Sequence, residues 1–343
     1  MILAADIGGT KALFAFYEIN DNFLQLVFLR RYASKDFTSL EKLINAFLTD
    51  YISENRSKPC IEAACFALAA TITDRGIYIS NLGWSMEIDS LKRMFPEISI
   101  MHLCNDLEAT GYGLDILPSA DLYQLNSDKN DTTNPLNGVQ SEKVTRRAII
   151  APGTGLGEAF LLGTKVIASE GGHCDFGPGS KTEMKLWEFL HEKYGHVSYE
   201  RILSGPGLTQ LERFVRHEEK NEEDDIQRLP EDITRLALSG QCSICKQALD
   251  IFVNILGAEA GNLALKFLAA DGIYLAGGIP PKILNKLKDG SFLNSFCMKG
   301  RYADMMRSIP VFVVLNPNTA LYGAAILAAK AMYPEVKLKL NID

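Results

Sequence analysis

The sequence has no excess of positive charge. Its 42 acidic residues outnumber 35 lysines and arginines, which gives a net charge of −7. Binding to nucleic acid or to an anionic membrane needs clustered basic residues, so we expect neither partner. The sequence also lacks a run of about 20 uninterrupted apolar residues, and Asp6 interrupts the apolar N-terminus before a signal peptide can develop. We therefore expect a small-molecule partner and a cytoplasmic location.

Cysteine occurs without the spacing of a disulfide framework or a zinc site. The seven cysteines are scattered, odd in number and mostly within apolar runs, which favours reduced, buried thiols. Cys242 and Cys245 stand at the start of a helical segment with no second pair nearby, so they indicate two buried helix thiols rather than a redox or metal motif. His173-Cys174-Asp175 likewise has no second ligand pair at a zinc-like spacing.

The chain length and the order of the predicted elements indicate a two-domain α/β protein. Its 343 residues exceed the roughly 250–300 at which a single core stops growing. Strand and helix patterns alternate along the chain, which is typical of α/β folds. We predict strands over 2–5, 12–18, 23–34, 61–70, 98–106, 147–163 (two strands), 272–276 and 309–315, and helices over 39–54, 90–97, 184–195, 207–219, 244–268 and 320–332. The polar stretch 126–146 is predicted to be an exposed loop near a domain boundary.

Three glycine-rich turns follow predicted strands. They are Gly8-Gly9-Thr10, Gly153-Thr154-Gly155-Leu156-Gly157 and Gly277-Gly278. Glycine lets successive backbone N–H groups converge on phosphate oxygens, and Thr10 and Thr154 add hydroxyl donors. The first two turns lie between two strands, which excludes a P-loop or a dinucleotide-binding turn, because those open a helix. Their similarity indicates a weak internal duplication, although any one turn could equally be a structural hairpin.

Acidic and amide side chains stand at the ends of two predicted strands. Asp6 could hold Mg²⁺ against nucleotide phosphates, directly or through water, or could form an Asx-turn. Asp106 could accept the proton of an attacking hydroxyl while the Asn105 amide holds the same substrate, or could simply cap the next helix. Glu170 and His173 bracket two glycines, an arrangement that suits a polyhydroxyl ligand or an ordinary polar loop.

Six motifs occur in an order and spacing that extend from Ile2 to about Ala331. They are Asp6-Ile7-Gly8-Gly9-Thr10, Asn105-Asp106, "APGTGLG" at 151–157, "EGGHCDFGP" at 170–178, "YERILSGPGL" at 199–208 and "LAGGIPP" at 275–281. Together they resemble the bacterial glucokinase family. This resemblance implies a two-domain, actin-like (ribonuclease H-like) sugar kinase fold of α/β class, with an interdomain cleft, glucose between the domains and ATP against the larger one.

The resemblance also implies a role for each matching residue. Asp106 is the implied catalytic base, which takes the proton of the 6-hydroxyl of glucose while the terminal phosphoryl group of ATP is transferred, giving glucose 6-phosphate and ADP. The other implied glucose ligands are Asn105, Glu170, His173 and Glu200. The implied phosphate and adenosine contacts are Asp6, Gly8, Gly9, Thr10, Gly153, Thr154, Gly155, Gly277 and Gly278, with Mg²⁺ held by Asp6 through water. A homodimer is expected on the same ground.

Two positions depart from the family pattern. Lys11 stands where glucokinases of this group usually have Asn, so "DIGGTK" is similar to the related repressor and sugar-kinase family, and Lys11 has no assigned role. That related family carries a zinc-binding cysteine cluster after its Gly-His motif, whereas residues 174–200 contain only Cys174, so we expect no zinc. The stretch "ALAATITD" lacks an expected Gly-Pro or Cys-Pro pair, which leaves contacts in the loop 69–84, including Asn81, unassigned.

The order of the motifs suggests how the domains divide. We expect a small domain of residues 1–114 plus 316–343 and a large domain of residues 115–315. Two alternative functions stay open at this point: a kinase for another hexose or with another phosphoryl donor such as polyphosphate, and a catalytically inactive sugar-sensing regulator. The acid at position 106 and the absence of a basic helix-turn-helix segment at the N-terminus argue against the regulator.

Overall fold

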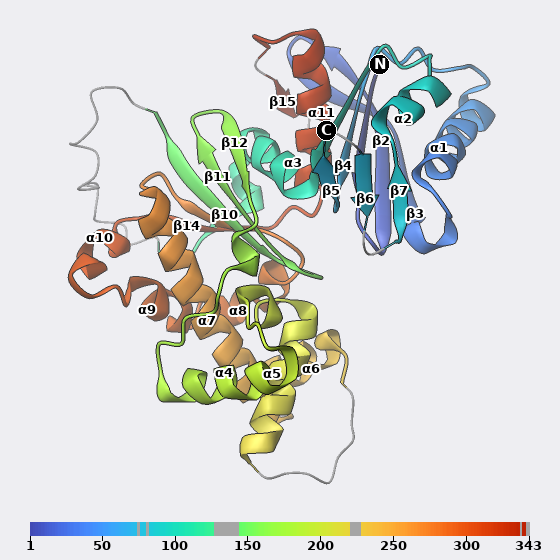
Figure 1. The fold of residues 1–343 in the computed structure, drawn as a ribbon. Coiled ribbons are helices and arrows are strands. Elements are labelled where there is room, and N and C mark those ends of the chain that lie inside the picture. The colour runs from blue at the N-terminus through green and yellow to red at the C-terminus, as the bar shows by residue number, and fades with distance from the viewer. Residues whose placement is uncertain (74–75, 80–81, 127–143, 220–227, 337, 341–343) are drawn as a thin grey trace. The chain divides into compact units, whose positions relative to one another are not determined.

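The chain forms two compact units of α/β structure. A computed structural model describes residues 1–73, 76–79, 82–126, 144–219, 228–336 and 338–340. One unit comprises Met1–Pro118 and Asn316–Asp343, and the other comprises Ser119–Leu315. Figure 1 shows the elements of each. The α/β class is confirmed, whereas the division into a small domain of residues 1–114 plus 316–343 and a large domain of residues 115–315 stays a prediction. Most of the polar loop predicted over 126–146, and Asn81, lie outside the described residues.

The first unit is built on a six-stranded sheet of order β15-β3-β2-β1-β4-β8. Its strands are β1 (Ile2–Ile7), β2 (Lys11–Asn20), β3 (Phe23–Ala33), β4 (Ala63–Leu68), β8 (Ile100–Asn105) and β15 (Lys339–Leu340). β1 pairs antiparallel with β2 and parallel with β4, which pairs parallel with β8. The carboxyl ends of β1, β4 and β8 therefore share one edge of the sheet, the place where open α/β sheets bind ligands.

A small second sheet in this unit was not predicted. It has the order β5-β6-β7, with β5 (Thr71–Thr73), β6 (Gly76–Ile79) and β7 (Trp84–Met86). Strands of three or four residues are too short to show a clear alternation of apolar and polar side chains.

The helices of the first unit are α1 (Leu40–Asn55), α2 (Ile88–Met94), α3 (Asp106–Gly113) and α11 (Thr319–Met332). The cap of α1 is Ser39, whose hydroxyl accepts a hydrogen bond from the Lys42 N–H. α11 packs against α3 so closely that a side chain at Gly323 would overlap the Ala109 carbonyl oxygen. The helix that begins with Asp106 is thus fixed by backbone-to-backbone packing against the C-terminal helix.

The second unit repeats the strand pattern of the first. Its sheet has the order β12-β11-β10-β13-β14-β9. The strands are β9 (Leu122–Gln124), β10 (Arg146–Pro152), β11 (Leu156–Leu162), β12 (Lys165–Ser169), β13 (Ile273–Leu275) and β14 (Val311–Val314). β12, β11 and β10 pair antiparallel, and β13 and β14 continue in parallel, as β3, β2, β1, β4 and β8 do. The internal duplication indicated by the two glycine turns is therefore confirmed in the topology.

The helices of the second unit are α4 (Lys181–Tyr194), α5 (Gly205–Glu218), α6 (Pro230–Leu238), α7 (Ser243–Phe267), α8 (Leu284–Leu287), α9 (Ser291–Cys297) and α10 (Ala303–Arg307). Short 3₁₀ turns in the two units are η1 (Ser34–Asp36), η2 (Leu114–Ile116), η3 (Ser119–Asp121), η5 (Gly171–His173), η6 (Tyr199–Arg201), η7 (Pro280–Ile283) and η8 (Gly300–Tyr302).

Within the described ranges, α7 is the one helix whose length and apolar composition would let it cross a membrane, and 67% of its most apolar window is buried inside the protein. The prediction of two buried thiols at its start is right for Cys245, which is fully buried. Cys242 is instead the partly exposed helix cap, whose Sγ accepts a hydrogen bond from the Cys245 N–H at 3.1 Å.

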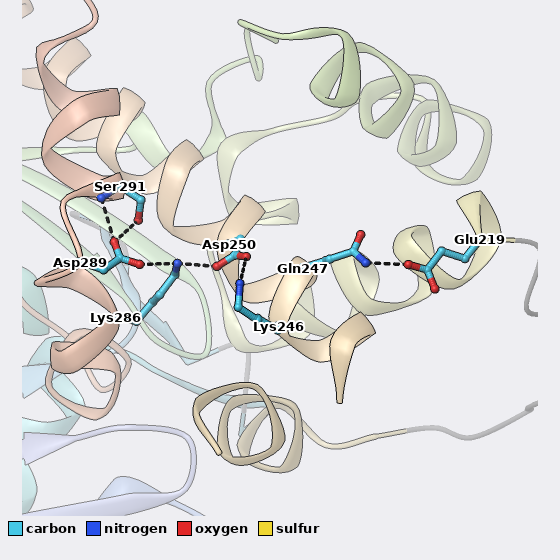
Figure 2. Close-up of polar contacts among 7 residues, drawn as sticks. All are labelled: Glu219, Lys246, Gln247, Asp250, Lys286, Asp289 and Ser291. Atoms are coloured by element: carbon cyan, nitrogen blue, oxygen red, sulfur yellow. Dashed lines mark hydrogen bonds and ion pairs between the residues drawn. The ribbon is translucent and has the colours of Figure 1, made fainter. Parts of the chain in front are cut away.

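Ion pairs connect α7 to the short helices that follow it in the chain. Lys286 lies between Asp250 of α7 and Asp289, and its Nζ is 2.6 Å from Asp289 Oδ2 (Figure 2). Asp289 also accepts hydrogen bonds from the backbone N–H and hydroxyl of Ser291, at the start of α9. On the other side, Asp250 pairs with Lys246 one turn earlier in α7, at 2.8 Å. This cluster fixes α8 and α9 against the central helix of the second unit.

Candidate active site

In the first unit, strand pairing brings the predicted acids to one edge of the sheet. Asp6 of β1 lies in register with Ala67 of β4, which lies in register with Cys104 of β8. The chain then passes from Asn105 at the end of β8 to Asp106, the first residue of α3. Asp6 and Asp106 thus stand at the carboxyl ends of two strands that are separated by one strand.

The pKa values of both acids are raised above their ordinary range. Burial raises the pKa of Asp6 to about 7, and the negative charge of Asp106 raises it as well, while Lys11 opposes both. Burial also raises the pKa of Asp106 to about 6, against the lowering effect of a hydrogen bond from the Leu107 N–H. Lys11, which had no role in the sequence analysis, therefore supplies positive charge near Asp6.

Asn105, not Asp106, is the cap of α3. Its Oδ1 accepts a hydrogen bond from the Leu107 N–H at 2.9 Å, and its amide donates to the Ala70 carbonyl oxygen at 3.5 Å. Asp106 Oδ1 accepts from the same Leu107 N–H at 2.9 Å. The capping interpretation of Asp106 is therefore wrong, because its neighbour already provides the cap. The shared N–H also holds the two side chains in a fixed relation at the helix start.

The first glycine turn is braced by a residue that the sequence analysis did not single out. The Gly8 N–H donates to the Lys11 carbonyl at 3.0 Å, which closes the turn between β1 and β2. Buried Ser34 donates through its hydroxyl to the Gly8 carbonyl at 2.7 Å and through its N–H to the Thr10 carbonyl at 3.1 Å. These bonds engage the carbonyl groups of the turn. Gly9 is half-buried and Thr10 is exposed.

In the second unit, the turn after β10 lies against Glu200. The Leu156 N–H donates to Glu200 Oε2 at 2.9 Å. A side chain at Gly155 would place its Cβ 2.5 Å from the same oxygen. The turn is closed by a bond from the Gly153 N–H to the Gly155 carbonyl at 2.8 Å, and the Gly205 N–H at the start of α5 donates to the Gly153 carbonyl at 2.8 Å. Glycine at 155 thus makes room for a carboxylate. Thr154, between the two glycines, is exposed.

Glu200 also joins the other residues predicted to bind sugar. His173 Nδ1 is 3.9 Å from Glu200 Oε1, and His173 Nε2 is 3.9 Å from Glu170 Oε2. Glu170 and His173 are largely exposed, whereas one third of the Glu200 side chain is exposed. A side chain at Gly172 would overlap the Leu156 carbonyl oxygen, so glycine there lets this loop pack onto β11. The structure therefore brings Glu170, His173 and Glu200 together.

The third glycine turn stands beside the second. Gly277 has a φ of +81°, and a Cβ there would lie 2.5 Å from the Pro152 carbonyl oxygen. The Ile279 N–H donates to that same carbonyl at 3.3 Å. A Cβ at Gly153 would meet the Gly278 nitrogen at 3.9 Å. The predicted phosphate turn and adenosine-side turn of this unit are thus neighbours, and both expose backbone at the end of parallel strands.

The acidic pair of the first unit fits the predicted magnesium ion. Among the residues that the structure describes, no group of three or more His, Cys, Asp and Glu side chains is placed to hold a metal. Mg²⁺ binds oxygen, retains several waters and takes one or two carboxylates together with phosphates, so Asp6 with water is a sufficient protein contribution. Burial and the negative charge of Asp106 both raise the pKa of Asp6, and a bound divalent cation would favour the ionised carboxylate.

Comparison with known proteins defines the class and then the family. The solved structure of glucokinase from an Antarctic psychrotroph superposes with a TM-score of 0.78 at 30% identity, covering 96% of this chain and 98% of that one. The fold is the two-domain actin-like sugar kinase fold. A model of the Glucokinase family matches residues 3–331. The glucokinase of Synechocystis sp. is 36% identical over 359 residues, which cover 96% of this chain and 98% of that protein. This chain belongs to the glucokinase family.

A more distant structure supports the fold alone. Glucokinase from Balamuthia mandrillaris, solved in complex with glucose, has a TM-score of 0.76 at 24% identity and covers 96% of this chain. The family prediction made from the six motifs is confirmed by the family model and by the Synechocystis relative.

Three site features escaped the reasoning from residue patterns alone. Glu200 was identified only through the family resemblance, because a glutamate near a helix start carries no signal by itself. Lys11 and Ser34 were not assigned, because their roles depend on β1, β2 and β3 folding back on one another. Two signals in the sequence could have pointed to Lys11 and Ser34. Lys11 is a basic residue directly after a glycine turn, and Ser34 is a serine at the end of a predicted strand.

Proposed function

We propose that this chain is a glucokinase in which Asp106 is the general base. The reaction transfers the terminal phosphoryl group of ATP to the 6-hydroxyl of glucose and releases ADP and glucose 6-phosphate. The observation that carries the proposal is the place of Asp106, at the start of α3 beside Asp6. Its pKa of about 6 leaves it ionised at neutral pH yet close enough to that pH to accept a proton effectively.

On the sugar side, the proposed ligands differ in whether they donate or accept hydrogen bonds. Glu170 and Glu200 accept hydrogen bonds from sugar hydroxyls, and His173 between them donates or accepts. The Asn105 amide is the fourth proposed ligand, and Asp106 accepts the proton of the reacting hydroxyl. Hydrogen bonds of this kind orient the acceptor, which supplies much of the rate enhancement in phosphoryl transfer.

On the nucleotide side, most of the proposed contacts to ATP come from backbone N–H groups. We propose that the turns containing Gly8, Gly9 and Thr10 in one unit and Gly153, Thr154 and Gly155 in the other hold the phosphates of ATP, and that Gly277-Gly278 lies on the adenosine side. Exposed N–H groups in glycine turns form concavities that suit anions. Mg²⁺ held by Asp6 through water would neutralise charge on the phosphate oxygens. Lys11 would add a further positive charge to the same region.

The remaining parts of the proposal follow from family membership and composition. We propose glucose and ATP as substrates, a cytoplasmic homodimer, and neither nucleic acid nor membrane as a partner. The net charge of −7 supports the last point, because basic patches dominate surfaces of those kinds.

The experiment that tests this function compares substrates. Hexose-dependent ADP release is measured with glucose, mannose and glucosamine as acceptors, and with ATP and polyphosphate as donors. The proposal predicts the highest kcat/KM for the pair glucose and ATP. A higher kcat/KM for another hexose or for polyphosphate would contradict the assignment of glucose and ATP as the preferred substrates. No ADP with any hexose would instead favour the sugar-sensing regulator.

A further inference from the structure

Two buried glutamates in the second unit have no part in the proposed reaction. Glu158 of β11 is 1% exposed and Glu259 of α7 is 0% exposed. Burying a carboxyl group without partners is costly, so buried acids normally have a structural or functional reason. Both lie behind residues already proposed to bind glucose.

Glu158 forms the floor of the loop that carries Glu170 and His173. A side chain at Gly171 would overlap Glu158 Oε2, so the loop backbone lies directly on this carboxyl group. The Gly171 N–H donates to Ser169 Oγ at 2.9 Å, and Ser169 is the partner of Glu158 in the pairing of β11 with β12. Glu158 Oε1 is buried and has no hydrogen-bond partner in the part of the chain that the structure describes.

Glu259 is connected by hydrogen bonds to the segment that carries Glu200, another proposed glucose ligand. Its Oε2 accepts a hydrogen bond from the Asn262 amide at 2.7 Å, and that amide also donates to the Tyr199 hydroxyl at 3.1 Å. Lys299 donates to Asn262 Oδ1 at 2.6 Å, which fixes the orientation of the amide. Tyr199 is buried and directly precedes Glu200 in the chain. Glu158 therefore lies behind the Glu170–His173 loop, and the hydrogen bonds that join Glu259, Asn262 and Tyr199 lie behind Glu200.

The charges around Glu158 come from several elements. Burial raises its pKa to about 7, the negative charge of Glu259 raises it as well, and Lys266 of α7 opposes them. Glu259 itself accepts from Lys266 Nζ at 3.4 Å. Burial and the charge of Glu259 raise the pKa of the Tyr199 hydroxyl on η6, whereas burial lowers the pKa of the Lys299 ammonium against the charge of Glu259. Only one of the two buried carboxyl groups has a cation within ion-pairing distance among the described residues. Glu158 is thus the member that is readily protonated near neutral pH.

We propose that Glu158 and Glu259 are positioning residues for the sugar ligands. In this network of buried supports, Glu158 lies under the backbone of the Glu170–His173 loop, and Glu259 holds the segment that carries Glu200 through Asn262 and Tyr199. Glu158 acts in its neutral form. This inference rests on the proposed glucokinase function, because it assigns the network to the glucose side of that reaction. It requires no contact between either glutamate and the substrate.

The test compares substitutions at position 158. Glu158→Leu removes the polar group while keeping most of the volume, and we expect the KM for glucose to rise about 10-fold or more with the KM for ATP within about twofold. Glu158→Gln resembles the neutral carboxyl group, and we expect its KM for glucose at pH 7 to stay within about twofold of the wild type. A purely structural role would lower thermal stability without this split between the two KM values.

The pH profile provides a second readout that does not depend on the leucine variant folding. As pH rises through about 7, Glu158 ionises next to Glu259, so the KM for glucose of the wild type should rise between pH 6.5 and 8.5, on the order of several-fold. The Glu158→Gln variant should lack that rise. Identical profiles in both proteins would overturn the inference, as would a Glu158→Leu variant with unchanged KM for glucose.

A matched control comes from the same unit. Glu212 of α5 is also 1% exposed and pairs with Arg216 at 2.7 Å and Arg228 at 2.6 Å. Glu212→Gln should lower the melting temperature without changing either KM selectively. Absence of glucose-dependent ADP release in the wild type would refute the proposed function itself, whereas normal wild-type turnover with no split in the variants would refute only this inference.

Discussion

The Leu156 N–H donates a hydrogen bond to Glu200 Oε2 at 2.9 Å, so the strand that leaves a predicted phosphate turn is tied to a predicted glucose ligand. His173 approaches the other oxygen of the same carboxylate, at 3.9 Å. One oxygen of Glu200 thus accepts a backbone hydrogen bond. The other faces His173, which is charged only when its imidazole is protonated. Within the second unit, the nucleotide side and the sugar side are therefore joined through a single side chain.

This relationship predicts the effect of Gly155→Ala. The added Cβ would lie 2.5 Å from Glu200 Oε2, and the carboxylate can move because it is the end of a flexible side chain. We expect a KM for glucose raised about 10-fold, with the free energy of unfolding changed by less than about 1 kcal/mol. Steady-state kinetics and urea unfolding measure the two quantities. Gly179→Ala, where a Cβ would have ordinary contacts, is the control. An unchanged KM for glucose would show that Glu200 does not bind the sugar.

The cluster in Figure 2 predicts how stability depends on Lys286. Lys286 is 15% exposed and pairs with both Asp250 and Asp289, so Lys286→Met leaves two partly exposed carboxylates without this partner. We expect a loss of about 1 kcal/mol in the free energy of unfolding at pH 7, near the upper limit for partly exposed pairs. Lys246→Met removes a mostly exposed pair with the same Asp250 and should cost only about 0.3 kcal/mol.

The same cluster fixes the sign of the pH dependence. Despite partial burial, the pKa of both carboxyl groups lies below the ordinary value of 3.8: hydrogen bonds from Lys246 and Lys286 lower that of Asp250, and hydrogen bonds from Lys286 and Ser291 lower that of Asp289. A carboxylate with a lowered pKa contributes stability that is present above 3.8 and is lost as pH falls through the folded-state value. The difference between wild type and Lys286→Met should therefore be constant from about pH 5 to 9 and shrink below about pH 4. A difference that grows on acidification would contradict this assignment.

Removal of magnesium tests the role of Asp6. With EDTA in excess over all divalent cations, we expect glucose-dependent ADP release to fall at least about 100-fold, because the phosphate charges lose their counter-ion. Added Mg²⁺ should restore turnover. Glucose binding measured by calorimetry without nucleotide should be the same with and without EDTA, since the sugar ligands include no metal. Full turnover in EDTA would show that the reaction does not require Mg²⁺.

The elements with strong periodicity were predictable from the sequence. The strands of the two glycine hairpins and the helices α1, α5 and α7 follow directly from apolar spacing. α6 and the sheet β5-β6-β7 were missed because short elements are stabilised by packing rather than by pattern.

The candidate site was predictable where residue type and strand position coincide. Asp6 and Asp106 stand at strand ends, where a carboxylate already suggests a ligand. The roles of Lys11, Ser34 and Glu158 were not predictable, because each depends on a neighbour from another strand or on burial that only the folded chain creates. The sequence left open whether Asp106 caps α3, because two adjacent polar residues can fill that one position, and in the folded chain Asn105 is the cap.

The most direct test of the account uses Asp106→Asn. The amide keeps the shape of the side chain and cannot accept the hydroxyl proton, so ADP release at saturating glucose and ATP should fall at least about 100-fold. Glucose binding by calorimetry should stay within about tenfold of the wild type, because the other proposed ligands are untouched. Loss of turnover with retained glucose binding is the predicted result. A variant that keeps more than about a tenth of wild-type turnover would show that Asp106 is not the base.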